Sequence, residues 1–181
     1  MLLIVLHNPQ HGPSYVHVFQ RHLNRRAALA KKSHFLFGPR ATGKSWLLRR
    51  QLPEAQVFDL LDHDVYSRLL RRPRQLGEEI QKKWVVIDEV QRIPELLNEV
   101  HRLIEEEHVR FLLTGSSARK LKRGGANLLA GRARSLALFP LTMTEIGNFE
   151  LIKYLNRGGL PSIYTSEDPA ADLKEYINLY L

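Results

Sequence analysis

Gly38-Pro39-Arg40-Ala41-Thr42-Gly43-Lys44-Ser45 is the most informative segment of the chain, because it matches G-x-x-x-x-G-K-[ST] at every fixed position. Glycine lets a backbone approach a polyphosphate closely and adopt conformations that other residues avoid. The N–H groups of such a loop cradle phosphates, and a helix that begins near Ser45 would point its positive end at them. The pattern therefore predicts a phosphate-binding loop.

Two residues at the end of this segment carry specific chemistry. The Lys44 ammonium would reach the β- and γ-phosphates, and the Ser45 hydroxyl would bind Mg²⁺. ATP and Mg²⁺ are therefore the predicted cofactors. The predicted nucleotide-binding residues are Gly38, Pro39, Arg40, Ala41, Thr42, Gly43, Lys44, Ser45 and Trp46.

The flanking sequence predicts that this segment lies between a strand and a helix. His34 to Phe37 is a short apolar run that stops at a Gly-Pro pair, as a buried strand does when it ends in a turn. A helix is predicted from Trp46 to Gln51, and Pro53 stops it. A strand before the loop and a helix after it are the context that supports phosphate binding.

The rest of the chain alternates between predicted strands and helices. Trp84 to Ile87 and Val109 to Leu113 are apolar throughout, as strands of a parallel sheet are when both faces are buried. Further strands are predicted at 57–61 and 135–139, and helices at 21–32, after Asp62 as N-cap, from Pro94 to 104, and over 141–181. This alternation predicts an α/β fold, a P-loop NTPase three-layer sandwich with a mainly parallel sheet and a short helical segment after it.

Asp88 and Glu89 directly follow the clearest predicted strand. Ligands of open α/β sheets bind outside the carboxyl ends of the strands, so both carboxylates are expected near the loop. Asp88 would hold Mg²⁺ through its water shell, and Glu89 would orient or deprotonate the attacking water. The alternative is that both residues cap the helix that starts near Pro94.

Hydroxyl groups follow the next apolar strand, in Thr114-Gly115-Ser116-Ser117. Thr114 or Ser116 would sense the γ-phosphate or orient water, and the alternative is a cap for a helix over 117–122. Three arginines stand near the last predicted strand, where a guanidinium would neutralise negative charge in the transition state of phosphoryl transfer. They are Arg123, Arg132 and Arg134, and a solvated basic edge or a nucleic-acid contact is the alternative.

Composition narrows the function classes. The chain has 181 residues, no cysteine and a formal net charge of +8. Without cysteine there is no disulfide framework or thiolate chemistry, which fits the reducing cytoplasm that we predict. No apolar run approaches the roughly 20 residues of a membrane span, so a soluble protein is predicted. The excess of basic residues favours the binding of polyanions, including nucleic acid. The densest basic run is Lys120 to Arg123. The histidines of the chain form no metal-binding sequence pattern.

The chain resembles a bacterial and archaeal family of AAA+-like ATPases, in which the ATPase core precedes a C-terminal domain of unknown function. Five segments carry this resemblance: Phe35 to Ser45, Val85 to Glu95, Phe111 to Ser117, Leu129 to Arg132 and Gly158 to Pro161. They span most of residues 20–181, and the second and third are far more specific than the phosphate loop alone.

The resemblance implies an AAA+ and ASCE-like sheet in which the Thr114 strand lies between the loop strand and the Asp88 strand. It implies a sensor region from Thr114 to Ser116 and a recurring arginine at Arg132 that acts within the chain or on a neighbour. Gly158 to Pro161 resembles a segment that lies by the adenine in related signalling ATPases.

The predicted organisation has three parts: a loose leader at 1–20, an ATPase core at 21–140 and a helical extension at 141–181. We expect the chain to be truncated before the family's C-terminal domain. The last helix, predicted from Asp168, carries an apolar stripe at Leu173, Tyr176, Ile177 and Tyr180. We expect self-association or weak turnover from that stripe. There are two alternative functions: an ATP-gated nucleic-acid-binding protein, and a truncated nucleotide-binding remnant without turnover. A small-molecule kinase is less favoured, because Glu89 offers a water-activating group beside the metal ligand.

Overall fold

The computed structural model describes residues 19–21, 31–116, 121 and 129–180. Contacts divide the chain into two compact units. The larger, here called the sheet unit, comprises residues 24–39 and 44–138, and the smaller, here called the C-terminal unit, comprises residues 1–23, 40–43 and 139–181.

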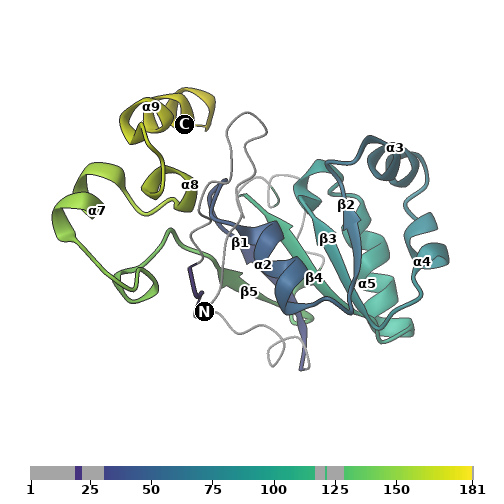
Figure 1. Cartoon of the computed structure of the whole chain (residues 1–181). Helices are drawn as coiled ribbons and strands as arrows, with labels where there is room; N and C mark the ends of the chain where they lie inside the picture. Colours follow the sequence, from purple (N-terminus) through teal and green to yellow (C-terminus); the bar gives the residue numbers. More distant parts are fainter. Residues whose placement is uncertain (1–18, 22–30, 117–120, 122–128, 181) are drawn as a thin grey trace. The chain divides into compact units, whose positions relative to one another are not determined.

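The sheet unit is built on five parallel strands in the order β2-β3-β4-β1-β5 (Figure 1). The strands are β1 (Ser33–Phe37), β2 (Gln56–Asp59), β3 (Trp84–Asp88), β4 (Arg110–Gly115) and β5 (Ala133–Ala137). The helices are α2 (Lys44–Gln51), α3 (His63–Arg71), α4 (Gln75–Glu79) and α5 (Leu96–Glu106), with a short 3-10 helix η1 (Val90–Arg92). The order confirms that β4, which carries Thr114, lies between β1 and β3.

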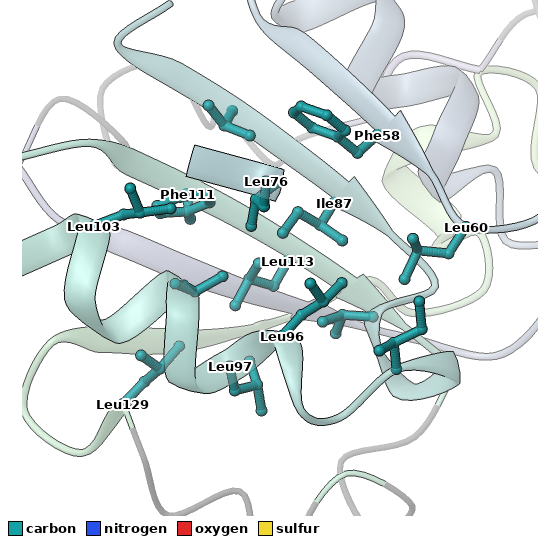
Figure 2. Close-up of a cluster of buried hydrophobic side chains, with 14 of the residues drawn as sticks. Phe58, Leu60, Leu76, Ile87, Leu96, Leu97, Leu103, Phe111, Leu113 and Leu129 are labelled. Atoms are coloured by element: carbon teal, nitrogen blue, oxygen red, sulfur yellow. The ribbon is translucent and has the colours of Figure 1, made fainter. Parts of the chain in front are cut away.

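Alternation along the strands divides the core between the two faces of the sheet. Val85 and Ile87 belong to a cluster with Phe111 and with the apolar side of α5, as Figure 2 shows for Ile87 and Phe111. Val86, between them, is equally buried but points to the other face, where Figure 1 shows α2. Helices on both faces explain why these strands are apolar throughout, and they confirm the predicted three-layer α/β sandwich.

Several predicted boundaries move in the structure. The second strand starts and ends one to two residues earlier than predicted, at Gln56 and Asp59, and the Leu60 N–H makes the last bond to β3, donating to the Asp88 carbonyl at 3.2 Å. Pro94 precedes α5 and is not in its first turn, since η1 occupies the chain between β3 and the helix. The fifth strand starts two residues earlier, in register with β1 from Ser33 and Ala133 onward. The predicted helix at 21–32 falls mostly outside the described residues.

The start of α3 confirms its predicted cap. The Asp62 carboxylate accepts hydrogen bonds from the N–H groups of Asp64 at 2.9 Å and Val65 at 3.1 Å. These are donors that lack a partner within the helix. The apolar positions of α3 then fall on one side, where Leu69 is fully buried in the sheet unit.

The C-terminal unit contains only helices after residue 141, as predicted: η3 (Met143–Glu145), α7 (Leu151–Arg157), α8 (Pro161–Tyr164) and α9 (Pro169–Tyr180). Its interior holds a buried ion pair, in which Arg21 Nε lies 3.3 Å from Glu145 Oε1. Of the predicted leader only Phe19 and Gln20 are described, and Phe19 is buried, with its ring edge-on to Tyr164.

Helix α9 has no buried residue, although its predicted stripe makes contacts at Tyr176 and Tyr180. The Tyr176 hydroxyl donates to the Arg40 carbonyl at 3.4 Å, and the Tyr180 ring lies 4.9 Å from the Arg40 guanidinium. Burial raises the pKa of Tyr176, and the nearby Tyr180 raises it further. Ile177 remains 46% exposed, so self-association through this helix stays a prediction. No helix in the described part of the chain is long and apolar enough to cross a membrane.

Candidate functional site

The loop after β1 has the backbone conformation that its sequence requires. A Cβ atom on Gly38 would lie 2.3 Å from the Leu138 carbonyl oxygen, so no other residue fits there without movement. Gly43 has φ of 83°, which glycine adopts without steric cost. Ala41 has φ of 60°, in the left-handed region that costs a non-glycine residue about 1–2 kcal/mol. Strain of this kind concentrates where a loop is held for function.

Lys44, the first residue of α2, folds back over the start of this loop. Its Nζ donates to the carbonyl oxygens of Gly38 at 2.7 Å and Pro39 at 2.9 Å, and the side chain is only 6% exposed. The cation is therefore held at the mouth of the loop, at the carboxyl edge of the sheet.

Ser45 and Trp46 occupy the first turn of α2, and both are half-buried. The first N–H groups of a helix have no partner within it, so this turn offers backbone donors beside the Ser45 hydroxyl. The Trp46 ring lies 5.8 Å from the Arg50 guanidinium, which stacks on it. Thr42 is buried at 1% exposure within the loop.

Strands β3 and β4 bring the predicted carboxylates, Asp88 and Glu89, close to the Thr114 hydroxyl. The Thr114 hydroxyl donates to Asp88 Oδ1 and accepts the Glu89 N–H at 3.0 Å. Asp88 is 3% exposed and Thr114 is fully buried. One hydroxyl on β4 thus fixes both the carboxylate that ends β3 and the backbone of the residue after it. Neither Asp88 nor Glu89 caps a described helix with its side chain.

Glu89 is held in an unusual conformation by this arrangement. Its backbone lies in the left-handed region, with φ of 60°, although it carries a side chain. The Gln91 side-chain amide donates to the Glu89 carboxylate. The oxygen of the Gln91 amide, Oε1, lies against Gly115, where a Cβ atom would be 2.6 Å away. Glu89 is therefore fixed on its backbone side by Thr114 and on its carboxylate side by Gln91.

Gln91 is the residue of this site to which the sequence analysis assigned no role. Its signal was its place two residues after Glu89, within a segment that resembles the ATPase family. What that segment does not reveal is that Gly115 on β4 leaves the space for the Gln91 amide. Arg92, beside it, donates to the Leu60 carbonyl and lies 4.5 Å from the Tyr66 ring centroid, which anchors η1.

The two predicted arginines that the structure describes, Arg132 and Arg134, are not brought to this cluster. Arg132 stands immediately before β5, at the amino edge of the parallel sheet, and its Nε lies 2.5 Å from Glu105 at the end of α5. Arg134 lies in β5, in register with His34, and is exposed. Arg123, together with Lys120 and Ser117, lies outside the described residues. Ser116, half-buried, follows β4 at the carboxyl edge.

Removal of the Thr114 hydroxyl tests this geometry. Thr114→Val keeps the shape but leaves the buried Asp88 carboxylate and the Glu89 N–H without a partner, which costs about 1–3 kcal/mol for each unsatisfied group. We expect lower stability in urea unfolding at constant m-value. Thr114→Ser, which keeps the hydroxyl, should lose much less. Equal losses in both variants would mean that the methyl packing, and not the hydrogen bonds, stabilises this position.

The residues of this cluster fit a nucleotide with Mg²⁺ by their chemistry. Gly43, with φ of 83°, gives the loop a backbone conformation in which its N–H groups can turn toward phosphate. Ser45 and Asp88 offer oxygen donors, which Mg²⁺ prefers, and a Mg²⁺ ion needs only one or two protein groups when phosphates complete its shell. The described residues contain no group of three or more His, Asp or Glu that would hold a metal ion alone.

Comparison with known proteins identifies the family and the fold of the chain. The chain is 33% identical over 165 residues to uncharacterized proteins of Mycobacterium bovis and Mycobacterium tuberculosis; the match covers 87% of this chain but only 37% of theirs. The Walker-type ATPase PABY2304 of Pyrococcus abyssi has a similar fold, with a TM-score of 0.58 and 16% identity over 90% of this chain and 72% of that one. The AAA domain family matches residues 30–147, so the chain belongs to the AAA domain family of P-loop proteins.

Proposed function

We propose that the sheet unit binds ATP with Mg²⁺ and hydrolyses it. The observation that carries the proposal is the Thr114 hydroxyl, which joins the Asp88 carboxylate to the backbone of a strained Glu89 at the sheet edge where the loop begins. Such a linkage fixes a metal-binding carboxylate and a candidate base relative to each other. Preorganised groups of this kind are what phosphoryl transfer requires, because its catalysis consists mainly of positioning and electrostatic stabilisation.

Each group has a distinct role in this proposal. Lys44 would exchange the carbonyl oxygens of Gly38 and Pro39 for phosphate oxygens, which keeps its ammonium satisfied in both states. The N–H groups at the start of α2 and along the loop would bind the phosphates. Ser45 and Asp88 would hold Mg²⁺, which neutralises charge on the phosphates when it is bound.

Glu89 is the proposed general base. One of its carboxylate oxygens accepts the Gln91 amide N–H, which leaves the other oxygen to accept a proton from water. The Gln91 contact restricts the rotation of the Glu89 side chain, so Gln91 acts as a positioning residue. A carboxylate held in one orientation loses less entropy when it binds the attacking water.

A hydrolysis assay on an Asp88 variant tests the proposal. Asp88→Asn keeps the hydrogen bond from the Thr114 hydroxyl but weakens the attraction for Mg²⁺. We expect phosphate release from ATP that requires Mg²⁺ in the wild-type protein and that needs about tenfold more Mg²⁺ in the variant. An unchanged Mg²⁺ requirement in the variant, or release that persists in EDTA, would contradict the assignment of Asp88.

A second candidate function, nucleic-acid binding, has one structural observation in its favour. The formal net charge is +8. Exposed cations gather at the amino edge of the sheet, and none of the described residues proposed to bind ATP lies there. This surface is independent of the ATP proposal.

A further inference from the structure

Helix α9 reaches the middle of the loop between β1 and α2. Residues 40–43 of this loop belong to the C-terminal unit, together with α9, whereas the rest of the loop belongs to the sheet unit. The Tyr176 hydroxyl donates a long hydrogen bond, 3.4 Å, to the Arg40 carbonyl, and the Tyr180 ring centroid lies 4.9 Å from the Arg40 guanidinium. One residue of the loop is therefore held by α9 at both its backbone and its side chain.

The peptide group that α9 holds leads directly into the strained residue of the loop. The Arg40 carbonyl lies in the same rigid plane as the Ala41 N–H, so a bond to that carbonyl restrains the orientation of the whole plane. The ψ angle of Arg40 and the φ angle of Ala41 together set this orientation. Ala41 has φ of 60°, in the left-handed region that a residue with a side chain rarely adopts. The Tyr176 bond therefore restrains the loop at its least favourable backbone angle.

Side-chain donors reach three consecutive carbonyl groups of this loop. The Lys44 ammonium binds the carbonyls of Gly38 and Pro39, and the Tyr176 hydroxyl binds that of Arg40. In the function proposed above, Lys44 leaves its two carbonyls to contact phosphate. The Tyr176 bond takes no part in that exchange, so the loop keeps one side-chain donor while the nucleotide is bound.

Helix α9 presents the two tyrosines from a supported face. Tyr176 and Tyr180 are four residues apart, so they lie on one side of the helix, with ring centroids 5.0 Å apart. Leu173 and Tyr176 are half-buried, and α9 packs against α7 and α8 within the C-terminal unit (Figure 1). The contact between the two rings limits the rotation of each, and the neighbouring helices limit the movement of α9. The two side chains that hold Arg40 are therefore held themselves.

We propose that Tyr176 and Tyr180 are positioning residues for ATP: by holding Arg40, they keep the loop between β1 and α2 in its phosphate-binding conformation before the nucleotide arrives. The apparent Kd of a ligand equals its intrinsic Kd divided by the fraction of molecules that are already in the binding conformation. A contact that raises this fraction tightens binding, although it does not touch the ligand. The inference rests on the proposed function, in which this loop binds the phosphates of ATP.

Isothermal titration calorimetry with Mg²⁺ and AMP-PNP, an ATP analogue that is not hydrolysed, measures this effect as a change in Kd. Tyr176→Phe removes one hydroxyl, so its Kd should rise about threefold. Tyr180→Leu removes the ring beside the Arg40 guanidinium, and its Kd should rise about two- to fivefold, as expected for an exposed cation–π contact. Tyr180→Phe keeps a ring face and should bind as the wild-type protein does. The matched control, Leu179→Ala, changes an exposed residue of the same helix and should keep the wild-type Kd.

Further measurements test whether Tyr180 acts through Arg40 and on phosphate binding. Arg40→Ala/Tyr180→Leu should bind AMP-PNP no more weakly than Arg40→Ala alone, because the ring has then lost its partner. Mg²⁺-tripolyphosphate, which has neither base nor ribose, should lose the same factor in affinity as AMP-PNP does in Tyr180→Leu. In the hydrolysis assay, Tyr180→Leu should raise KM by that factor at an unchanged kcat, because Asp88 and Glu89 are untouched.

The outcomes separate this inference from the function on which it rests. If AMP-PNP does not bind the wild-type protein, both are overturned. If it binds, any of three results overturns the inference alone: a wild-type Kd in Tyr180→Leu, additive losses from Arg40→Ala and Tyr180→Leu, or an unchanged tripolyphosphate affinity in Tyr180→Leu, which would mean that the ring contacts the base. Because α9 has no buried residue, the variants should fold, and circular dichroism checks that they do.

Discussion

Replacement of Lys44 by alanine is expected to abolish the stabilisation that Mg²⁺-ATP gives to the wild-type protein. At an ATP concentration 100 times its Kd, ligand binding contributes about 2.7 kcal/mol to the free energy of unfolding. For a chain of this size that corresponds to a rise in Tm of about 5–10 °C. Because the Lys44 ammonium is held over the start of the loop, its removal takes away the cation that is expected to contact the phosphates.

The variant without ligand should melt close to the wild-type protein. Lys44→Ala loses two hydrogen bonds, but Pro39 is exposed, so water replaces the ammonium at its carbonyl. Arg49→Ala is the matched control: it removes an exposed cation from the same helix, whose guanidinium lies 3.8 Å from Asp59. Differential scanning fluorimetry with and without Mg²⁺-ATP should show the full shift in the control. Equal shifts in Lys44→Ala and wild type would falsify the assignment of this loop to phosphate.

Glu89→Gln should reduce the rate of ATP hydrolysis by about 10²–10⁴-fold and leave ATP binding unchanged. The amide cannot take a proton from water, yet its oxygen still accepts the Gln91 N–H, and the backbone N–H still reaches Thr114. The geometry of the site is therefore preserved while its basicity is removed.

Single-turnover phosphate release measures the rate, and the ATP-dependent rise in Tm measures binding in the same variant. Glu95→Gln, an exposed carboxylate just before α5, serves as the control and should hydrolyse at the wild-type rate. If Glu89→Gln also hydrolyses at that rate, Glu89 has a structural role and water is activated by another group. The hydrolysis rate of Gln91→Ala should lie between the rates of Glu89→Gln and of the wild-type protein, because this substitution frees the Glu89 side chain without removing its carboxylate.

Sequence patterns predicted the buried part of this fold well. Strands β1, β3 and β4 each contain an uninterrupted apolar run, and a sheet covered on both faces buries most of these residues. The cap at Asp62 was predictable for the same reason, since it depends on neighbours in the chain. The family resemblance added the strand order, which no local pattern contains.

Boundaries and distant partners were less predictable, because they depend on residues far apart in the chain. The end of β2 is set by its pairing with β3, where the Leu60 N–H makes the last bond, to the carbonyl of Asp88. Arg132 was expected in the nucleotide site, but β5 runs parallel to β1, so the residue before β5 lies at the amino edge, beside Glu105. A role for Arg132 in catalysis would therefore have to come from contact with a neighbouring molecule.

By itself the sequence determined the glycine-containing loop between β1 and α2, the carboxylates after β3 and the burial of the sheet, since each depends on a short run of residue types. Tertiary structure alone decided that the Thr114 hydroxyl joins Asp88 to Glu89, and that Gly115 makes room for Gln91. It also decided that Tyr176 and Tyr180, near the end of the chain, hold Arg40 in the loop. The reason is physical: contacts between strands, and between a helix and a distant loop, depend on register, strand order and packing, which local propensity does not encode.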